Sequence, residues 1–74
     1  MLITIKLFAT FRQGRFKIEE REVPEGTTVA DVLKSLDIAQ EEVGTLFVKG
    51  RHVEPDRTLA AGEAVAIFLL VGGG

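Results

Sequence analysis

The last three residues of the sequence are Gly72, Gly73 and Gly74, and they follow an apolar run from Ala64 to Val71. Glycine has no Cβ and tolerates a wide range of backbone angles, so three in succession form a thin chain end that can enter another protein's active site. The reactive group at such an end is the terminal carboxylate. We therefore expect the carboxylate of Gly74 to carry the chemistry, once a leaving group has made it an electrophile.

The other side chains offer little for catalysis. The chain has no cysteine, tyrosine or tryptophan, and we expect a surface or structural role for its one histidine, His52. Without cysteine, neither a disulfide nor a thiolate metal site can form, and we expect no bound metal. Glu54, Asp56 and Glu63 fall in turn-rich sequence and are expected to be solvated rather than an acid/base pair. No Walker-type phosphate loop is present, so ATP would be bound by a partner.

Composition limits the class of protein. The 74 residues make one domain, with 46% hydrophobic content and 11 acidic against 9 basic residues, interspersed, for a net charge of −2. No clustered basic face is predicted, which argues against nucleic-acid binding. The N-terminus lacks the features of a signal peptide, and the longest apolar run of eight residues is far short of the ~20 that span a bilayer. We expect a soluble, cytoplasmic protein without membrane contact.

The first half predicts a hairpin and a helix. Residues 2–9 and 15–23 alternate between apolar and polar side chains, which is typical of strands, and the turn between them contains Gly14. From residue 28 the period changes, with Thr28 as N-cap and Asp31 in an acidic variant of the capping box. The apolar residues then recur at i, i+3, i+4 and i+7, on one side of a helix that would cover one face of the sheet: Val29, Val32, Leu33 and Leu36.

The second half predicts three more strands. Residues 37–44 form a loop with room for a helical turn, residues 45–53 a strand, glycine turn and short strand, and residues 54–63 a turn-rich segment. Residues 64–70 are almost wholly apolar, as in a central strand covered on both faces. The order β-β-α-β-β-β predicts an α+β, ubiquitin-like β-grasp with a mixed sheet of four to five strands and one main helix. Its first and last strands would pair in parallel, with residues 1–70 as the domain and residues 71–74 as a flexible tail.

Three features together resemble the MoaD/ThiS family of ubiquitin-like sulfur carriers: "IKLFATFR", "LFVKGRHVEPDRTLAAGEAVAIF" and the terminal Gly-Gly. The family includes the small subunit of molybdopterin synthase and the thiamin-pathway sulfur carrier. The resemblance implies that a ubiquitin-activating-like adenylyltransferase uses ATP to adenylate Gly74. It also implies that a sulfur donor enzyme then supplies sulfide to form a thiocarboxylate, which an acceptor synthase consumes.

The resemblance also assigns partner-binding residues. It places Gly73 beside Gly74 and Arg12 at a basic position near the tail. Phe8 and Phe68 match apolar positions that dock partners in the molybdopterin branch. That branch commonly has two prolines where this chain has Leu69 and Leu70, and a residue with a small side chain where it has Gly72. These departures bear on the acceptor and leave the chemistry at Gly74 unchanged.

The C-terminal tail can be held in a partner's active site only if the folded domain also binds that partner. Ordering Val71 to Gly74 costs on the order of 4–8 kcal/mol, and these four residues have almost no side chains with which to recover it. An apolar patch must therefore hold the partner, and we expect Phe8, Phe68 and Leu70 to form it on the face without the helix. Phenylalanine is more often a core residue, so Phe8 and Phe68 could instead belong to the core.

The sequence leaves the acceptor open. The "KLFATFR" segment and the long second-strand insert favour the molybdopterin synthase large subunit over thiazole synthase. Two further classes of protein are compatible with this sequence. One is a ubiquitin-like modifier, whose Gly74 forms isopeptide bonds to lysines, and the second is an interaction domain without chemistry.

Overall fold

The computed structural model describes residues 1–9 and 15–70. Within these residues the chain forms one sheet of five strands, one α-helix and one short 3-10 helix. Their bounds are β1 (Leu2–Ala9), β2 (Arg15–Glu22), α1 (Val29–Ser35), η1 (Gln40–Glu42), β3 (Val43–Val48), β4 (Arg51–His52) and β5 (Ala64–Leu69). The predicted order of elements is confirmed.

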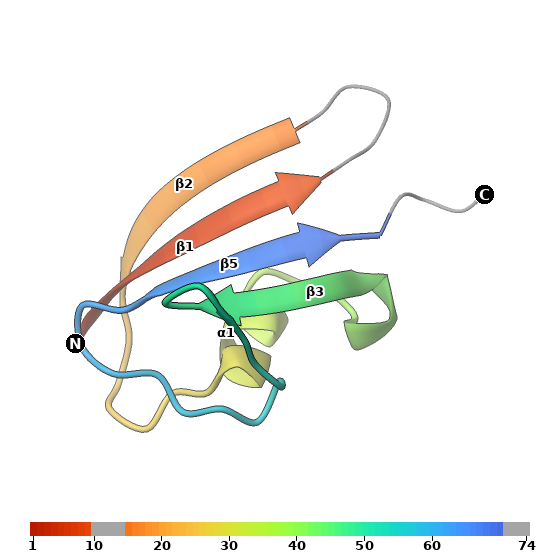
Figure 1. Cartoon of the computed structure of the whole chain (residues 1–74). Coiled ribbons are helices and arrows are strands. Elements are labelled where there is room, and N and C mark those ends of the chain that lie inside the picture. Colours follow the sequence, from red (N-terminus) through yellow and green to blue (C-terminus); the bar gives the residue numbers. More distant parts are fainter. Residues whose placement is uncertain (10–14, 71–74) are drawn as a thin grey trace.

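The sheet has the strand order β2-β1-β5-β3-β4. Strands β1 and β5 lie side by side at its centre and are parallel, while β2 and β3 run antiparallel to them on either side (Figure 1). The parallel pairing of the first and last strands is therefore confirmed. The sheet is mixed, as expected.

The core lies between α1 and one face of the sheet. Alternate residues of each central strand point into it, so that Ile3 and Ile5 of β1 meet Val65 and Ile67 of β5. Ten hydrophobic side chains of the described residues are 0–3% exposed: Ile3, Ile5, Val29, Val32, Leu33, Leu46, Val48, Leu59, Val65 and Ile67. The helical positions Val29, Val32 and Leu33 are those predicted from their spacing, and Leu36 packs at the edge of the core.

The helix begins at the predicted cap. The hydroxyl oxygen of Thr28 accepts a hydrogen bond from the Asp31 N–H at 3.2 Å, and the Asp31 carboxylate accepts one from the Thr28 N–H at 3.0 Å. The hydrogen bond from the Thr28 N–H, followed by one from the Thr28 side chain, lowers the pKa of the Asp31 carboxyl group. With only seven residues, α1 depends on packing against the sheet more than on its own helix propensity.

Two expectations about strands were wrong. Strand β5 is covered on one face only, because α1 lies on the side of Val65 and Ile67, and the opposite side chains Ala64, Ala66 and Phe68 are partly exposed. Strand β3 begins at Val43 rather than at residue 45, because Val43 pairs with Leu69 across a bulge at Gly44. In the described part of the chain, no helix has the length and apolar character needed to cross a membrane.

Candidate functional site

Among the side chains that the structure describes, three phenylalanines lie on the sheet face that α1 leaves open. Phe8 of β1 is directly opposite Phe68 of β5, and their rings stack with centroids 4.5 Å apart and planes 8° from parallel. Phe47 of β3 meets Phe68 edge to face, at 5.7 Å between centroids and 87° between planes. All three are half-buried and none belongs to the core, so we call Phe8, Phe47 and Phe68 the aromatic cluster.

Sequence reasoning placed Phe8 and Phe68 on this face but missed Phe47. The signal was present, because Leu46 and Val48 point into the core and strand alternation sends Phe47 to the other side. The ring of His52 stands edge to face against Phe47 at 6.2 Å, and its Nδ1 lies 3.8 Å from the exposed carboxylate of Glu54. Among the described residues no group of three potential metal ligands occurs.

A hollow of about 330 Å³ opens beside the aromatic cluster. Ala64 and Ala66 of β5 are among its lining residues, and the rings of Phe8, Phe47 and Phe68 are around them. Two cationic side chains, Lys6 and Lys49, complete the lining together with Gly50. The open face is therefore apolar at its centre and basic at the margin of the hollow.

Leu70 follows β5 and is 53% exposed. Its N–H donates to the backbone carbonyl of Glu42 at 2.8 Å, which ties the end of β5 to the last residue of η1, directly before β3. Gly44 permits this arrangement, since a Cβ built there would lie 3.0 Å from the Phe68 carbonyl oxygen and 3.2 Å from Leu70 Cδ2. The backbone is thus fixed up to the last described residue.

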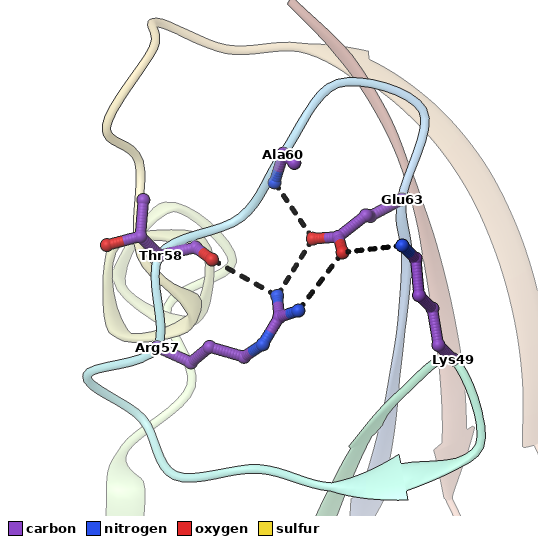
Figure 2. A network of polar contacts seen from close by, with 5 residues as sticks. All are labelled: Lys49, Arg57, Thr58, Ala60 and Glu63. Atoms are coloured by element: carbon purple, nitrogen blue, oxygen red, sulfur yellow. Dashed lines mark hydrogen bonds and ion pairs between the residues drawn. The ribbon is translucent and has the colours of Figure 1, made fainter.

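Glu63 contradicts the expectation of a solvated loop residue. Its side chain is 5% exposed and its carboxylate is enclosed by donors from two loops (Figure 2). The two terminal nitrogens of Arg57 donate to its two oxygens at 2.8 and 3.0 Å, and the Ala60 N–H donates at 2.8 Å. The ammonium of Lys49 lies 3.5 Å away. The turn-rich sequence did not predict this network, because its residues come into contact only in the folded chain, where the two loops lie against each other.

The network determines the charge state of Glu63. The hydrogen bonds from Arg57, followed by that from Ala60, lower the pKa of Glu63 from 4.5 to about 2. The same pairing raises the pKa of Arg57. A carboxylate that is fully engaged and ionised at neutral pH is a structural anion rather than a general acid or base.

Five of the candidate residues lie outside the described residues: Arg12, Val71, Gly72, Gly73 and Gly74. The described candidates are Phe8 and Phe68, which the structure brings into contact, and Leu70, which lies beyond the end of β5.

Comparison with known proteins identifies the family of this chain. The model of the ThiS family matches residues 5–74, which include every candidate site residue. The chain belongs to the ThiS family. The resemblance to the MoaD/ThiS sulfur carriers is thereby confirmed. No match was found among curated proteins.

Solved structures support the fold. SAMP1 from Haloferax volcanii is similar with a TM-score of 0.69 and 23% identity, and the similarity covers 100% of both chains. A ubiquitin from Caldiarchaeum subterraneum is similar with a TM-score of 0.62 and 22% identity, again over 100% of both chains. At these identities the likeness concerns the fold, and the predicted ubiquitin-like β-grasp is confirmed. Membership of the ThiS family makes this chain a small ubiquitin-like carrier or modifier that works with activating and acceptor enzymes.

Proposed function

We propose that this protein is a sulfur carrier whose reactive group is the terminal carboxylate of Gly74. The observation that carries the proposal is the pairing of two features in one ThiS-family chain. The family match continues through Gly74, and the aromatic cluster stands uncovered on the sheet face beside β5, the strand that leads toward that end.

Activation takes place on a partner enzyme. A carboxylate oxygen of Gly74 attacks the α-phosphorus of ATP, pyrophosphate leaves, and an acyl adenylate forms. Hydrosulfide then attacks the acyl carbon and AMP departs with the electrons of the broken C–O bond, which leaves a thiocarboxylate. The partner supplies the ATP site, since this chain has no phosphate-binding loop. The sulfur reaches the partner as hydrosulfide from a donor enzyme.

Docking requires the folded body. Phe8, Phe68 and Leu70 bind the partner, while the segment from Val71 to Gly73 enters its active site and Arg12 meets its surface. The contacts of this surface with the partner offset the free-energy cost of ordering the glycine backbone. Aromatic side chains suit this role because they bury a large area with few rotatable bonds.

For the acceptor we propose the large subunit of a molybdopterin synthase. The segment "KLFATFR" and the long second-strand insert support this choice. By resemblance to that branch, Phe8 and Phe68, whose rings stack, match apolar positions that dock partners. Thiazole synthase of the thiamin pathway is the second candidate. Incubation of thiocarboxylated protein with each acceptor, followed by assay of sulfur transfer, distinguishes them.

The deciding experiment is intact mass spectrometry after incubation with ATP, sulfide and the ubiquitin-activating-like enzyme from the same organism. We expect a gain equal to sulfur replacing one oxygen. The matched control lacks Gly73 and Gly74: it should keep its melting temperature and gain no mass. The positive control is a parallel reaction in which the same enzyme loads a carrier that it is known to load. If that control succeeds and the wild-type chain gains no mass, the proposal is contradicted. Conjugates of higher mass, with isopeptide bonds to lysine, would instead support a protein modifier.

A further inference from the structure

We propose that the hollow beside the aromatic cluster receives one apolar side chain of the activating enzyme, and that carboxylates flank that side chain. This inference rests on the proposed function and adds what the docking partner must present. It is carried by the shape of the hollow and by the charges at its margin.

The shape comes from the small residues of β5. The register places Ala64 beside Thr4 and Ala66 beside Lys6 of β1, while Ala66 also faces Phe47 of β3. Two residues later β5 places Phe68 between Phe8 and Phe47. A step from alanine to phenylalanine along one strand face leaves a depression bounded by rings, with a volume of about 330 Å³.

The surroundings fit a protein side chain better than a small molecule. Small-ligand sites enclose most of the ligand and aim several polar groups at it. This hollow lies on the open face of a sheet, and the lining side chains that carry polar groups are Lys6 and Lys49. An apolar anchor seated in a depression is instead typical of the centre of a protein–protein interface, and the rim around that centre is polar.

The positive charges at the margin of the hollow favour a partner with carboxylates around its apolar side chain. Lys6 makes no ion pair within the described residues. Lys49 lies 3.5 Å from Glu63, but that carboxylate is also paired with Arg57, so the group of three retains one positive charge. The hollow is therefore basic on a chain whose net charge is −2.

Acidic residues of the same face lie away from the hollow's aromatic end. Glu20 is opposite Thr4 and Glu22 is opposite Leu2, toward the start of β1, whereas Phe8 is near its end. The carboxylate of Glu22 is also 3.4 Å from the N-terminal ammonium. Along β1, Glu20 and Glu22 thus lie on the other side of Lys6 from Phe8, and the carboxylate beside Lys49 is that of Glu63, which is buried and paired with Arg57.

The test measures the dissociation constant between the full chain and the activating enzyme used in the mass experiment. Ala66→Leu places a larger side chain in the hollow and should raise the dissociation constant at least tenfold, which is the effect typical of a lost central contact. Its control, Ala61→Leu, makes the same change in an exposed turn and should leave the constant within twofold.

Charge is tested separately. Lys6→Glu should weaken binding about tenfold at low salt, and the difference from wild type should shrink at high salt because ions screen the lost attraction. Lys34→Glu makes the same change in net charge at an exposed position of α1 and should have less than a threefold effect on the dissociation constant.

The outcomes separate the two proposals. In one outcome wild type is loaded with sulfur, while Ala66→Leu and Lys6→Glu both fold and bind the activating enzyme as tightly as wild type does. The inference about the hollow is then wrong, and the proposal of a sulfur carrier stands. If Lys6→Glu and Lys34→Glu weaken binding equally, the carboxylate rim is wrong. If wild type neither binds nor is loaded, both proposals fail. If Ala66→Leu does not fold, the comparison of Lys6→Glu with Lys34→Glu decides whether the inference about the hollow holds.

Discussion

Replacement of Glu63 by glutamine should make the protein less stable at neutral pH and remove part of its acid sensitivity. Glutamine keeps the shape of the side chain and one carbonyl oxygen for the Ala60 N–H. Its amide nitrogen, however, presents a donor to one terminal nitrogen of Arg57, where the second carboxylate oxygen had accepted a hydrogen bond at 3.0 Å. Both the charge pairing and one charge-assisted hydrogen bond are lost.

The magnitude follows from the pKa of Glu63, which folding lowers from 4.5 to about 2. Each pH unit of difference is worth about 1.4 kcal/mol, which gives roughly 3 kcal/mol as an upper limit. Solvent screens part of this because the side chain of Arg57 is 35% exposed. We therefore expect about 2 kcal/mol from this group.

The sign follows from the lowered value. The folded state holds Glu63 ionised more strongly than the unfolded state does, so its stabilisation is complete above about pH 5. It is lost as the pH falls from there toward the folded-state pKa of about 2. Wild type should lose this contribution over that window, whereas Glu63→Gln has none to lose.

The assay is urea denaturation at pH 7, 4.5, 3 and 2 for wild type and Glu63→Gln. The free energies of unfolding should differ by about 2 kcal/mol at pH 7 and converge toward pH 2. Glu54→Gln is the control, because Glu54 is an exposed acidic residue and should differ little from wild type at pH 7. Parallel curves for wild type and Glu63→Gln from pH 7 to 2 would refute the reasoning, since the pH dependence would then arise elsewhere.

Three further substitutions test other parts of the structure. Gly44→Ala places a Cβ 3.0 Å from a backbone carbonyl and should destabilise the fold by about 1–3 kcal/mol in urea, with a shifted amide resonance for Leu70; an unchanged resonance would mean that the bulge relaxes elsewhere. Thr28→Ala removes the cap and should cost about 1 kcal/mol, or a fall of roughly 4–8 °C in melting temperature. Phe68→Arg should fold with little change in its circular dichroism and bind the activating enzyme at least tenfold more weakly; a chain that fails to fold would place Phe68 in the core.

The sequence predicted the parts of the fold that follow from local periodicity. Alternation in residues 2–9 assigned Ile3 and Ile5 to one face and Phe8 to the other, because the side-chain period of a strand is two. Helical spacing found Val29 and its buried neighbours, and Thr28 with Asp31 marked the start of the helix. The position of Phe8 and Phe68 opposite the helix then followed from topology alone.

What the sequence could not predict depends on contacts between distant segments. Glu63 becomes a buried anion only because Arg57 and Ala60 fold back onto it, and local turn signals do not encode that return. Gly44 resembled an ordinary loop glycine, although its lack of a Cβ is needed for the approach of Phe68 and Leu70. The hollow combines residues of three strands, so it exists only in the paired sheet.

The parallel pairing of β1 with β5 joins the two halves of the proposed mechanism. Its register sets Phe8 beside Phe68, two residues before Leu70, so the strand that supplies the centre of the aromatic cluster is also the strand that continues toward Gly74. A slip of one residue in β5 would turn Phe68 into the core and expose Ile67. Burial of Val65 and Ile67 against α1 prevents that slip. A partner held at the aromatic cluster therefore also holds the point from which the glycines continue, which is why docking and delivery should fail together in Phe68→Arg.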